Sequence, residues 1–257
     1  MTNLLKTIII SEKRKNLLIL LKTGTHNWDE IKVRLNVTAT GMLPQIKILE
    51  DEHLVMRQGK EFSLTPMGSV IVNQMEPVFR TIEVFNRYKK FWQEHELNDL
   101  TPDILADIRN LGDYEIIENA DENLFDISTL LNNISGAKSL KGITHTIYPQ
   151  HSDFFLNMAK NGTKTSLILN PGVLKIMMTR YPKVLDTWLK IESSEFYVSR
   201  KDIRFSYLVT DSLLSLSLFY HNGIYDSKNE VVSRDPSALA WGERIFLHFQ
   251  AQSDKIN

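Results

Sequence analysis

The segment from Leu35 to Gly68 constrains the fold of this 257-residue chain more than any other part of the sequence. It reads LNVTATGMLPQIKILEDEHLVMRQGKEFSLTPMG, in which an apolar-faced helix near 40–53 precedes two short strand-like runs. The turn Gln58-Gly59-Lys60 separates those runs, and Thr65-Pro66 has the pattern of a helix cap followed by a first-turn proline. Together with amphipathic helices expected at 11–22 and 28–35, this order of elements predicts a winged helix-turn-helix.

The helix near 40–53 has the features of a DNA-reading helix. We expect Leu43, Ile46 and Leu49 to face the core, which leaves its polar side chains for a DNA groove or its walls. A glutamine can contact adenine in a bidentate manner, and basic residues beside a wing turn can reach phosphates. The predicted DNA-binding residues are Thr38, Thr40, Met42, Gln45, Lys47, Arg57 and Lys60.

The distribution of charge agrees with this interpretation only weakly. Residues 1–65 hold ten Lys and Arg against seven Asp and Glu, whereas the remainder of the chain is mildly acidic. The net charge of the whole chain is -1, so the protein as a whole is not a basic nucleic-acid binder. A winged helix can also dock on proteins, and an adaptor without sequence-specific DNA binding stays open as the alternative function.

The helix that starts at Pro66 carries a long apolar stripe, which suggests a partner. Stripe residues recur at helical spacing, and Pro77 predicts a kink after Met75. The predicted dimerisation residues are Ile71, Met75, Val78, Ile82 and Phe85. Packing of the same stripe against its own domain is the alternative explanation.

Beyond Asn98 the pattern alternates between helical and strand-like runs, which predicts a mixed α/β domain. We expect a winged helix-turn-helix at 1–70, a linking or dimerisation helix at 66–97, and an α/β sensor or effector-binding domain at 98–257. The fold class is therefore α+β. The expected strands are 142–148, 164–170, 196–199, 203–210 and 213–220, and the expected helices lie near 120–135, 151–160, 171–191 and 236–249.

Two stretches of the chain resemble a known family. TATGMLPQIKILEDEHLV followed by FSLTPMG looks like the DNA-binding half of archaeal winged-helix regulators with a FilR-type sensor domain. VTDSLLSLSLFYHNGIYDSKNEVVSRDPSALAWGERIFLHF resembles the closing stretch of that sensor. The resemblance implies a transcription regulator, usually dimeric, whose second domain is distantly similar to phospholipase D-like domains that have lost their catalytic residues.

Several kinds of catalytic chemistry lack their required residues. The chain has no cysteine, which excludes disulfides and thiolate catalysis. A phospholipase D-type site needs His-x-Lys, but His145 and His151 each lack the lysine two positions later. Gly162-Thr163-Lys164-Thr165 lacks the upstream glycine of a phosphate-binding loop, and it is better interpreted as a helix end. We therefore expect no enzyme activity, no catalytic residues, no metal site and no cofactor.

What remains for the second domain is binding of an effector, a small molecule or a partner protein. Polar and aromatic residues at strand ends are the candidates, since ligands of α/β domains bind there. The predicted effector-binding residues are Tyr148, His151, Arg204, Thr210, Asp211, Tyr225 and Asp226. With no apolar run long enough for a membrane span and no secretory signal pattern, we expect a cytoplasmic homodimer that binds double-stranded DNA and no membrane.

Overall fold

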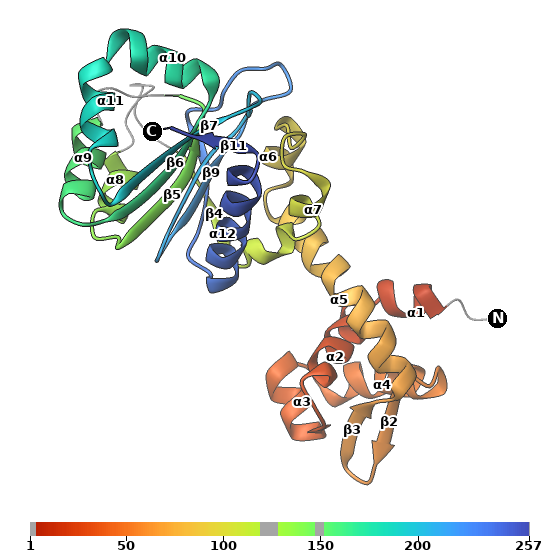
Figure 1. Cartoon of the computed structure of the whole chain (residues 1–257). Helices are drawn as coiled ribbons and strands as arrows, with labels where there is room; N and C mark the ends of the chain where they lie inside the picture. Colours follow the sequence, from red (N-terminus) through yellow and green to blue (C-terminus); the bar gives the residue numbers. More distant parts are fainter. Residues whose placement is uncertain (1–3, 119–127, 147–151, 257) are drawn as a thin grey trace. The chain divides into compact units, whose positions relative to one another are not determined.

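The computed structural model describes residues 4–118, 128–146 and 152–256, and its contacts divide the chain into two compact units (Figure 1). The first unit is Met1–Ile82 and the second is Glu83–Asn257. The boundary lies inside helix α5, Pro66–Arg87. It therefore precedes the boundary expected at residue 98, because the segment after α5 packs into the core of the second unit.

The first unit is a winged helix-turn-helix, as predicted. Its three-stranded antiparallel sheet has the order β1-β3-β2, and β2 pairs with β3 so that Val55 lies opposite Leu64 and Gln58 opposite Glu61. The elements are α1 Leu4–Ile9, α2 Glu12–Lys22, β1 His26–Asn27, α3 Trp28–Leu35, α4 Ala39–Asp51, β2 Val55–Gln58, β3 Glu61–Leu64 and the start of α5. Helix α1 was not expected from the sequence.

Side-chain caps explain where the helices of the first unit begin. Asn27 and Glu30 form a reciprocal capping box at the start of α3, and Thr38 accepts a hydrogen bond from the backbone N–H of Gly41 at the start of α4. Between these two helices Asn36 adopts a left-handed conformation with φ 49°, which asparagine tolerates better than most residues. The turn of the helix-turn-helix is therefore encoded by local polar residues.

The first unit has its own apolar core. The wing contributes to it through Phe62, whose side chain points inward from β3. Gly68 is required where α5 leaves the wing, because a Cβ there would lie 2.1 Å from the carbonyl oxygen of Leu54. The buried core residues are Ile8, Leu17, Leu18, Leu21, Ile31, Met42, Ile46, Leu49, Leu54, Val55, Phe62 and Val72.

Helix α5 continues through Pro77, so the helix is not broken where the sequence predicted a kink. The break comes later, at Tyr88, whose φ of -131° and ψ of 56° are not helical. Helix α6, Lys89–Glu94, follows, and its Phe91 and Trp92 are buried in the second unit.

The second unit is built on an eight-stranded mixed sheet with the order β11-β7-β6-β5-β8-β9-β10-β4. Strands β5, β6 and β7 are parallel, and the remaining neighbours pair antiparallel. The strands are β4 Tyr114–Glu118, β5 Ser139–Thr144, β6 Lys164–Leu169, β7 Ser194–Ser199, β8 Ser206–Thr210, β9 Leu214–Ser217, β10 Asn229–Ser233 and β11 Ser253–Lys255. The helices are α7 Pro102–Leu105, the 3-10 turn η1 Ile108–Leu111, α8 Ser128–Ile134, α9 Ser152–Lys160, α10 Pro171–Arg180, α11 Pro182–Leu189 and α12 Pro236–Gln250.

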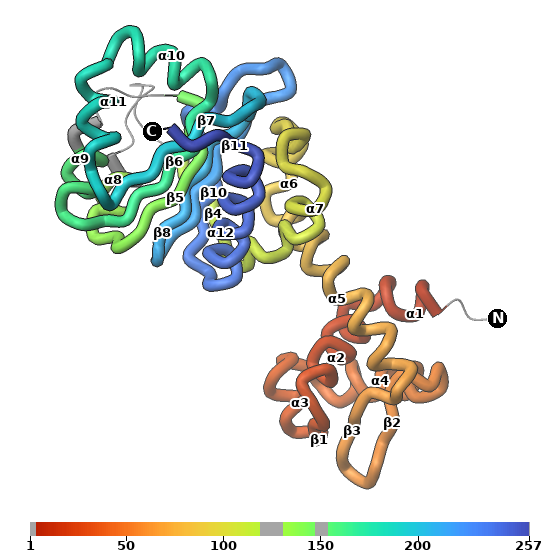
Figure 2. Tube along the Cα trace, in the orientation of Figure 1, coloured from red at the N-terminus to blue at the C-terminus, as the bar shows by residue number. Residues whose placement is uncertain are grey.

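Helices cover both faces of this sheet, which gives three layers (Figures 1 and 2). Helix α12 packs on one face through Trp241, Ile245 and Phe246, together with α6, α7 and η1. Helices α8 to α11 pack on the other face, where Met158 and Trp188 contribute to two smaller apolar clusters. The α+β class predicted from the sequence is confirmed. Among the described residues, no helix is both long and apolar enough to cross a membrane.

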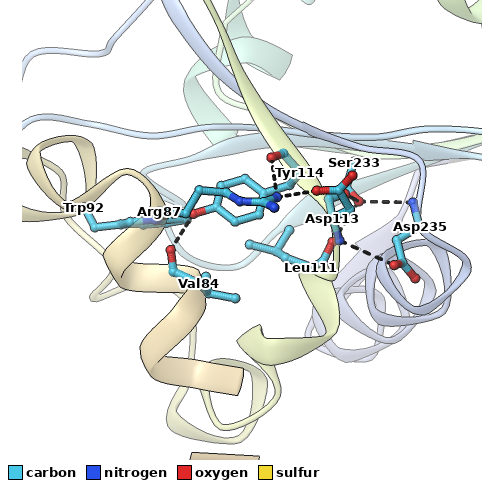
Figure 3. A network of polar contacts seen from close by, with 8 residues as sticks. All are labelled: Val84, Arg87, Trp92, Leu111, Asp113, Tyr114, Ser233 and Asp235. Carbon is cyan, nitrogen blue, oxygen red and sulfur yellow. Dashed lines mark hydrogen bonds and ion pairs between the residues drawn. The ribbon is translucent and has the colours of Figure 1, made fainter. Parts of the chain in front are cut away.

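A polar network fixes the end of α5 within the second unit (Figure 3). The hydroxyl of Tyr114 donates a hydrogen bond to the carbonyl oxygen of Val84 and accepts one from Trp92 Nε1 at 2.9 Å. Arg87 forms an ion pair with Asp113 and donates to the carbonyl oxygen of Tyr114 at 3.0 Å. The last turn of α5 is thus held to β4 by buried hydrogen bonds of Tyr114 and by an exposed ion pair of Arg87.

Ser233 and Asp235 continue this network toward α12. The Oγ of Ser233 lies 2.8 Å from the carbonyl oxygens of both Leu111 and Asp113, which share its single O–H donor. Asp235 caps α12 and also accepts a hydrogen bond from the backbone N–H of Asp113 at 3.4 Å.

Candidate nucleic-acid interface and ligand-binding residues

Helix α4 has a solvent-exposed face that includes Lys47. Thr38, Thr40 and Lys47 are exposed, and no acidic residue lies between Ala39 and Ile48. Acidic residues occur only near the end of the helix, at Glu50 and Asp51. The amino-terminal half of α4 is therefore the part suited to approach an anionic duplex.

The structure contradicts the prediction that Met42 contacts DNA. Met42 is 0% exposed, whereas Leu43, which we expected in the core, is 46% exposed. The reason is the helical repeat: Met42, Ile46 and Leu49 lie at i, i+4 and i+7 and form the face that packs toward the core. Met42 is a core residue of the first unit and cannot read a base.

Gln45 does not project freely from α4, contrary to the prediction that it reads adenine. Its side chain is half-buried, and its Oε1 accepts hydrogen bonds from Arg14 Nη1 at 3.0 Å and Ser11 Oγ at 3.4 Å. A bidentate contact to adenine needs that oxygen, so it would require these bonds to break. In this geometry Gln45 links α4 to the start of α2.

Lys13 lies beside the start of α4 and was not among the predicted residues. Its Nζ is 3.4 Å from the carbonyl oxygen of Gly41, and its side chain is exposed. Lys13 lies in the first turn of α2, two residues after the N-cap Ser11, and it contacts the first turn of α4, which no sequence pattern indicated. Lys13 adds positive charge where Thr38 and Thr40 are exposed.

The wing carries two exposed basic residues, as expected. Gly59 adopts φ 64° in the turn between β2 and β3, a conformation that favours glycine. Arg57 Nε donates to the carbonyl oxygen of Gly59 at 2.8 Å, and its guanidinium lies over the Phe62 ring at 5.4 Å. Arg57 is thus held in place at the wing, while Lys60 is exposed at its tip.

The predicted dimerisation residues divide into two groups. Ile71 and Met75 pack against the core of the first unit, and Phe85 packs in the second unit with its ring 5.5 Å from that of Trp92. These three are therefore largely accounted for by packing within their own units. Val78 and Ile82 are exposed.

The structure separates the predicted effector residues, and two of them cannot be placed. Tyr148 and His151 lie outside the described residues. Strand β8 runs antiparallel to β5, and Thr210 lies opposite Leu140. Thr210 and Asp211 therefore lie at the end of the sheet where β5 begins. Asp211 there accepts a hydrogen bond from the backbone N–H of Lys138 at 2.9 Å, which is a turn-stabilising role.

Thr210 has a similar local role, since its Oγ1 accepts hydrogen bonds from the backbone N–H groups of Ser212 and Leu213. Arg204 and Tyr225 lie instead near the opposite end of the sheet, where β5 ends. Arg204 precedes β8, and both residues lie close to the ring of Phe219. The two groups therefore lie at opposite ends of β5 and do not form one site.

Arg204, Tyr225 and two residues that sequence reasoning missed gather at the end of β5. Arg204 pairs with Glu96 at 3.2 Å, and its guanidinium lies 5.2 Å from the Phe219 ring centre. The ring of Tyr225 lies 6.1 Å from that of His145, which directly follows β5. Asn170 Nδ2 lies 2.8 Å from His145 Nδ1 and 2.8 Å from Asp202 Oδ1, so it fixes the histidine ring.

The sequence contained a signal for this group. His145 and Asn170 each follow a strand, at matching ends of the parallel pair β5 and β6, which is where ligands of such sheets bind. Among the described residues, no cluster of three His, Asp or Glu side chains could hold a metal ion.

Asp226 is a buried structural residue rather than a free contact for a ligand. Its Oδ2 lies 2.9 Å from His95 Nε2, and both side chains are almost fully buried. Burial by itself would raise the pKa of the Asp226 carboxyl, but hydrogen bonds from His95, Asn229 and Tyr220 outweigh it and hold that pKa well below its usual range. The same environment raises the pKa of Tyr220 to about 12, through burial and its bond to Asp226.

His95 has a polar partner at each of its two ring nitrogens. Nδ1 lies 2.7 Å from the carbonyl oxygen of Phe91, and Nε2 faces the ionised carboxylate of Asp226. A carbonyl oxygen and a carboxylate only accept hydrogen bonds, so each ring nitrogen of His95 faces an acceptor. This ion pair, sandwiched by the rings of Phe91 and Tyr220, ties α6 to the loop before β10.

Comparison with known proteins gives two matches to family models. The model for the methanogenesis regulatory protein FilR1, N-terminal domain, matches residues 2–83, and that for the middle domain of the same protein matches residues 126–252. Methanogenesis regulatory protein FilR1 of Methanothrix harundinacea (strain 6Ac) is 23% identical over 264 residues. That match covers 100% of this chain but only 59% of the length of the relative.

Solved structures with similar folds include an archaeal chromatin protein, TrmBL2, described as showing a novel mode of DNA binding. It is 15% identical with a TM-score of 0.44, and the match covers 94% of this chain and 93% of TrmBL2. A phospholipase D family member, NUC from Salmonella typhimurium, is 10% identical with a TM-score of 0.43, covering 56% of this chain and 98% of NUC.

Proposed function

This chain belongs to the family of the methanogenesis regulatory protein FilR1, and we propose that it regulates transcription by binding double-stranded DNA. The proposal includes a homodimer and a second unit that senses a small molecule or a partner protein. Because the chain spans 59% of its curated relative, that relative's own activity does not by itself define the activity of this chain.

The observation that supports the proposal best is the joint exposure of α4 and the wing. Thr38, Thr40 and Lys47 are exposed on a helix with no acidic residue in its first three turns, and Lys13 lies beside its start. Arg57 and Lys60 add cationic groups at the wing. A helix with this face fits a major groove, while flanking basic residues contact phosphates.

The experiment is a fluorescence anisotropy titration of the full chain against duplexes selected from a pool with a randomised centre. We expect binding to weaken linearly in a plot of log affinity against log salt concentration. Lys47→Ala and Arg57→Ala should each reduce the slope by about 0.9, the contribution of one phosphate contact.

The matched control for both variants is Lys183→Ala, which removes an exposed lysine from α11 in the second unit. That variant should retain the slope of the unmodified protein. If no duplex is enriched in the selection and binding does not depend on salt, the chain is the protein-interaction adaptor considered above and the proposal is wrong.

Sensing is proposed for the group of side chains at the end of β5. His145 and Tyr225 are half-buried there, and Arg204 keeps part of its guanidinium exposed beside Glu96. This group borders the segment that follows α6, since Glu96 N–H donates to the carbonyl oxygen of Phe219 at 2.7 Å. An effector alters DNA affinity only if it binds one arrangement of the protein better than another.

A further inference from the structure

Helix α4 carries an exposed leucine in the part of the chain that we expect to read DNA. Leu43 is 46% exposed, whereas its neighbour Met42 is fully buried. Leu43 lies three residues after Thr40 and four before Lys47, so these three side chains share one side of the helix. A single exposed leucine is common on protein surfaces, and its significance depends on what surrounds it.

The surroundings of Leu43 suit an anionic partner. The first three turns of α4 contain no acidic residue, and Lys47 follows one turn after Leu43 on the same side. Arg57 and Lys60 are exposed on the wing of the same unit. An apolar side chain among positive charges complements a DNA groove, in which phosphates flank base edges that include apolar methyl groups.

Polar side chains near Leu43 are engaged in contacts within the chain. Gln45 Oε1 accepts hydrogen bonds from two side chains at the start of α2. The Oγ1 of Thr38 accepts a hydrogen bond from the backbone N–H of Gly41 and lies 3.3 Å from Thr40 Oγ1. Leu43 has no polar group to engage in this way, so its exposed side chain is available for an apolar contact with a base.

Resting on the proposed binding of double-stranded DNA, we propose that Leu43 determines specificity by contacting the C5-methyl group of a thymine in the major groove. Thymine is the base of unmodified DNA that presents a methyl group there, so an aliphatic side chain distinguishes it from the other bases. Pro44 is exposed next to Leu43 and extends the apolar surface. Lys47 then contacts a phosphate beside the same base pair.

Replacement of thymine by deoxyuridine tests this contact, because it removes only the methyl group from the base. The duplex selected with the full chain is compared with the same duplex in which deoxyuridine replaces every thymine. Burial of one methyl group changes an affinity about fourfold, so anisotropy titrations should show binding weakened by about that factor or more. Single replacements then identify the thymine concerned.

Variants at residue 43 connect the loss to the leucine. Leu43→Ala should bind the thymine and deoxyuridine duplexes with nearly equal affinity, and its exposed position should leave the fold intact, as circular dichroism can verify. Leu43→Met keeps an apolar side chain of similar size and should retain most of the discrimination. Leu247→Ala is the matched control, because it truncates an exposed leucine of α12 in the second unit, and it should discriminate as the unmodified protein does.

The outcomes separate this inference from the proposed function. Equal affinity of the unmodified protein for both duplexes overturns the role of Leu43, and so does discrimination that persists in Leu43→Ala. In either case, salt-dependent binding to the selected duplex leaves the proposed function standing. Absence of salt-dependent binding to any duplex refutes both.

Discussion

Removal of the buried carboxylate at Asp226 should destabilise the second unit strongly. In Asp226→Asn, an amide nitrogen replaces an oxygen that now accepts hydrogen bonds. Asp226 Oδ2 accepts from His95 Nε2 and from Asn229 Nδ2, both at 2.9 Å, and Oδ1 accepts from two backbone N–H groups. Whichever way the amide is turned, it therefore faces at least one donor.

The size of the effect follows from burial of the pair. The side chains of His95 and Asp226 are each only 1% exposed, so solvent cannot compensate for the missing charge. Loss of one partner of a buried ion pair costs about 3–5 kcal/mol in the free energy of unfolding. For a unit of this size, each kcal/mol lowers Tm by about 2–4 °C, which predicts a decrease of about 6–20 °C.

Thermal melting followed by tryptophan fluorescence measures this decrease. Trp92, Trp188 and Trp241 belong to the second unit, whereas Trp28 belongs to the first, so the signal reports mainly on the unit that contains Asp226. Asp186→Asn is the control, because it makes the same chemical change at an exposed position of α11. A Tm for Asp226→Asn within about 2 °C of that of the control would show that the ion pair contributes less than about 1 kcal/mol.

Three further outcomes are expected. As the pH falls from about 4, the pKa of an unfolded aspartate, toward the lower pKa of folded Asp226, the unmodified protein should progressively lose free energy of unfolding. Asp226→Asn should not show this loss, and parallel acid unfolding of both proteins would contradict the prediction. Met42→Ala should lower the free energy of unfolding of the first unit by about 2–5 kcal/mol in urea, with Leu43→Ala close to neutral; equal losses would show that the buried face of α4 is misassigned. Gly68→Ala should abolish or severely weaken folding of the same unit, because its Cβ would collide with the Leu54 carbonyl group, whereas Gly172→Ala, with open space around it, should be tolerated; circular dichroism distinguishes the two.

Local signals in the sequence were sufficient to predict the architecture of the first unit. Asn27, Thr38 and Gly59 determine caps and a turn through interactions with residues a few positions away, so a linear pattern contains the information. The face of α4 was less predictable. Met42 and Leu43 are apolar neighbours, and both lie at helical spacing from Ile46. Only the spacing from Leu49, seven residues for Met42 and six for Leu43, places Met42 on the buried face.

The second unit shows where such reasoning fails. Strands β4, β10 and β11 were not predicted, since their residues become strands through pairing with distant segments, as when Val231 lies opposite Ile116. For the same reason Thr210 and Arg204, six residues apart in the chain, were both predicted to bind an effector. The direction of β8 within the sheet places them at opposite ends of the strands, and no short-range pattern reveals that direction.

The pairing of β2 with β3 limits how the length of the wing hairpin can vary among related proteins. Phe62 anchors the hairpin from one side of its ladder, and neighbouring side chains alternate between the two sides. An extension of one residue in each strand would turn the tip residues over, whereas an extension of two would preserve their orientation and add about 7 Å of length. Natural variation in this hairpin should therefore occur in even steps, and each step would keep the orientation of the basic residues near its tip.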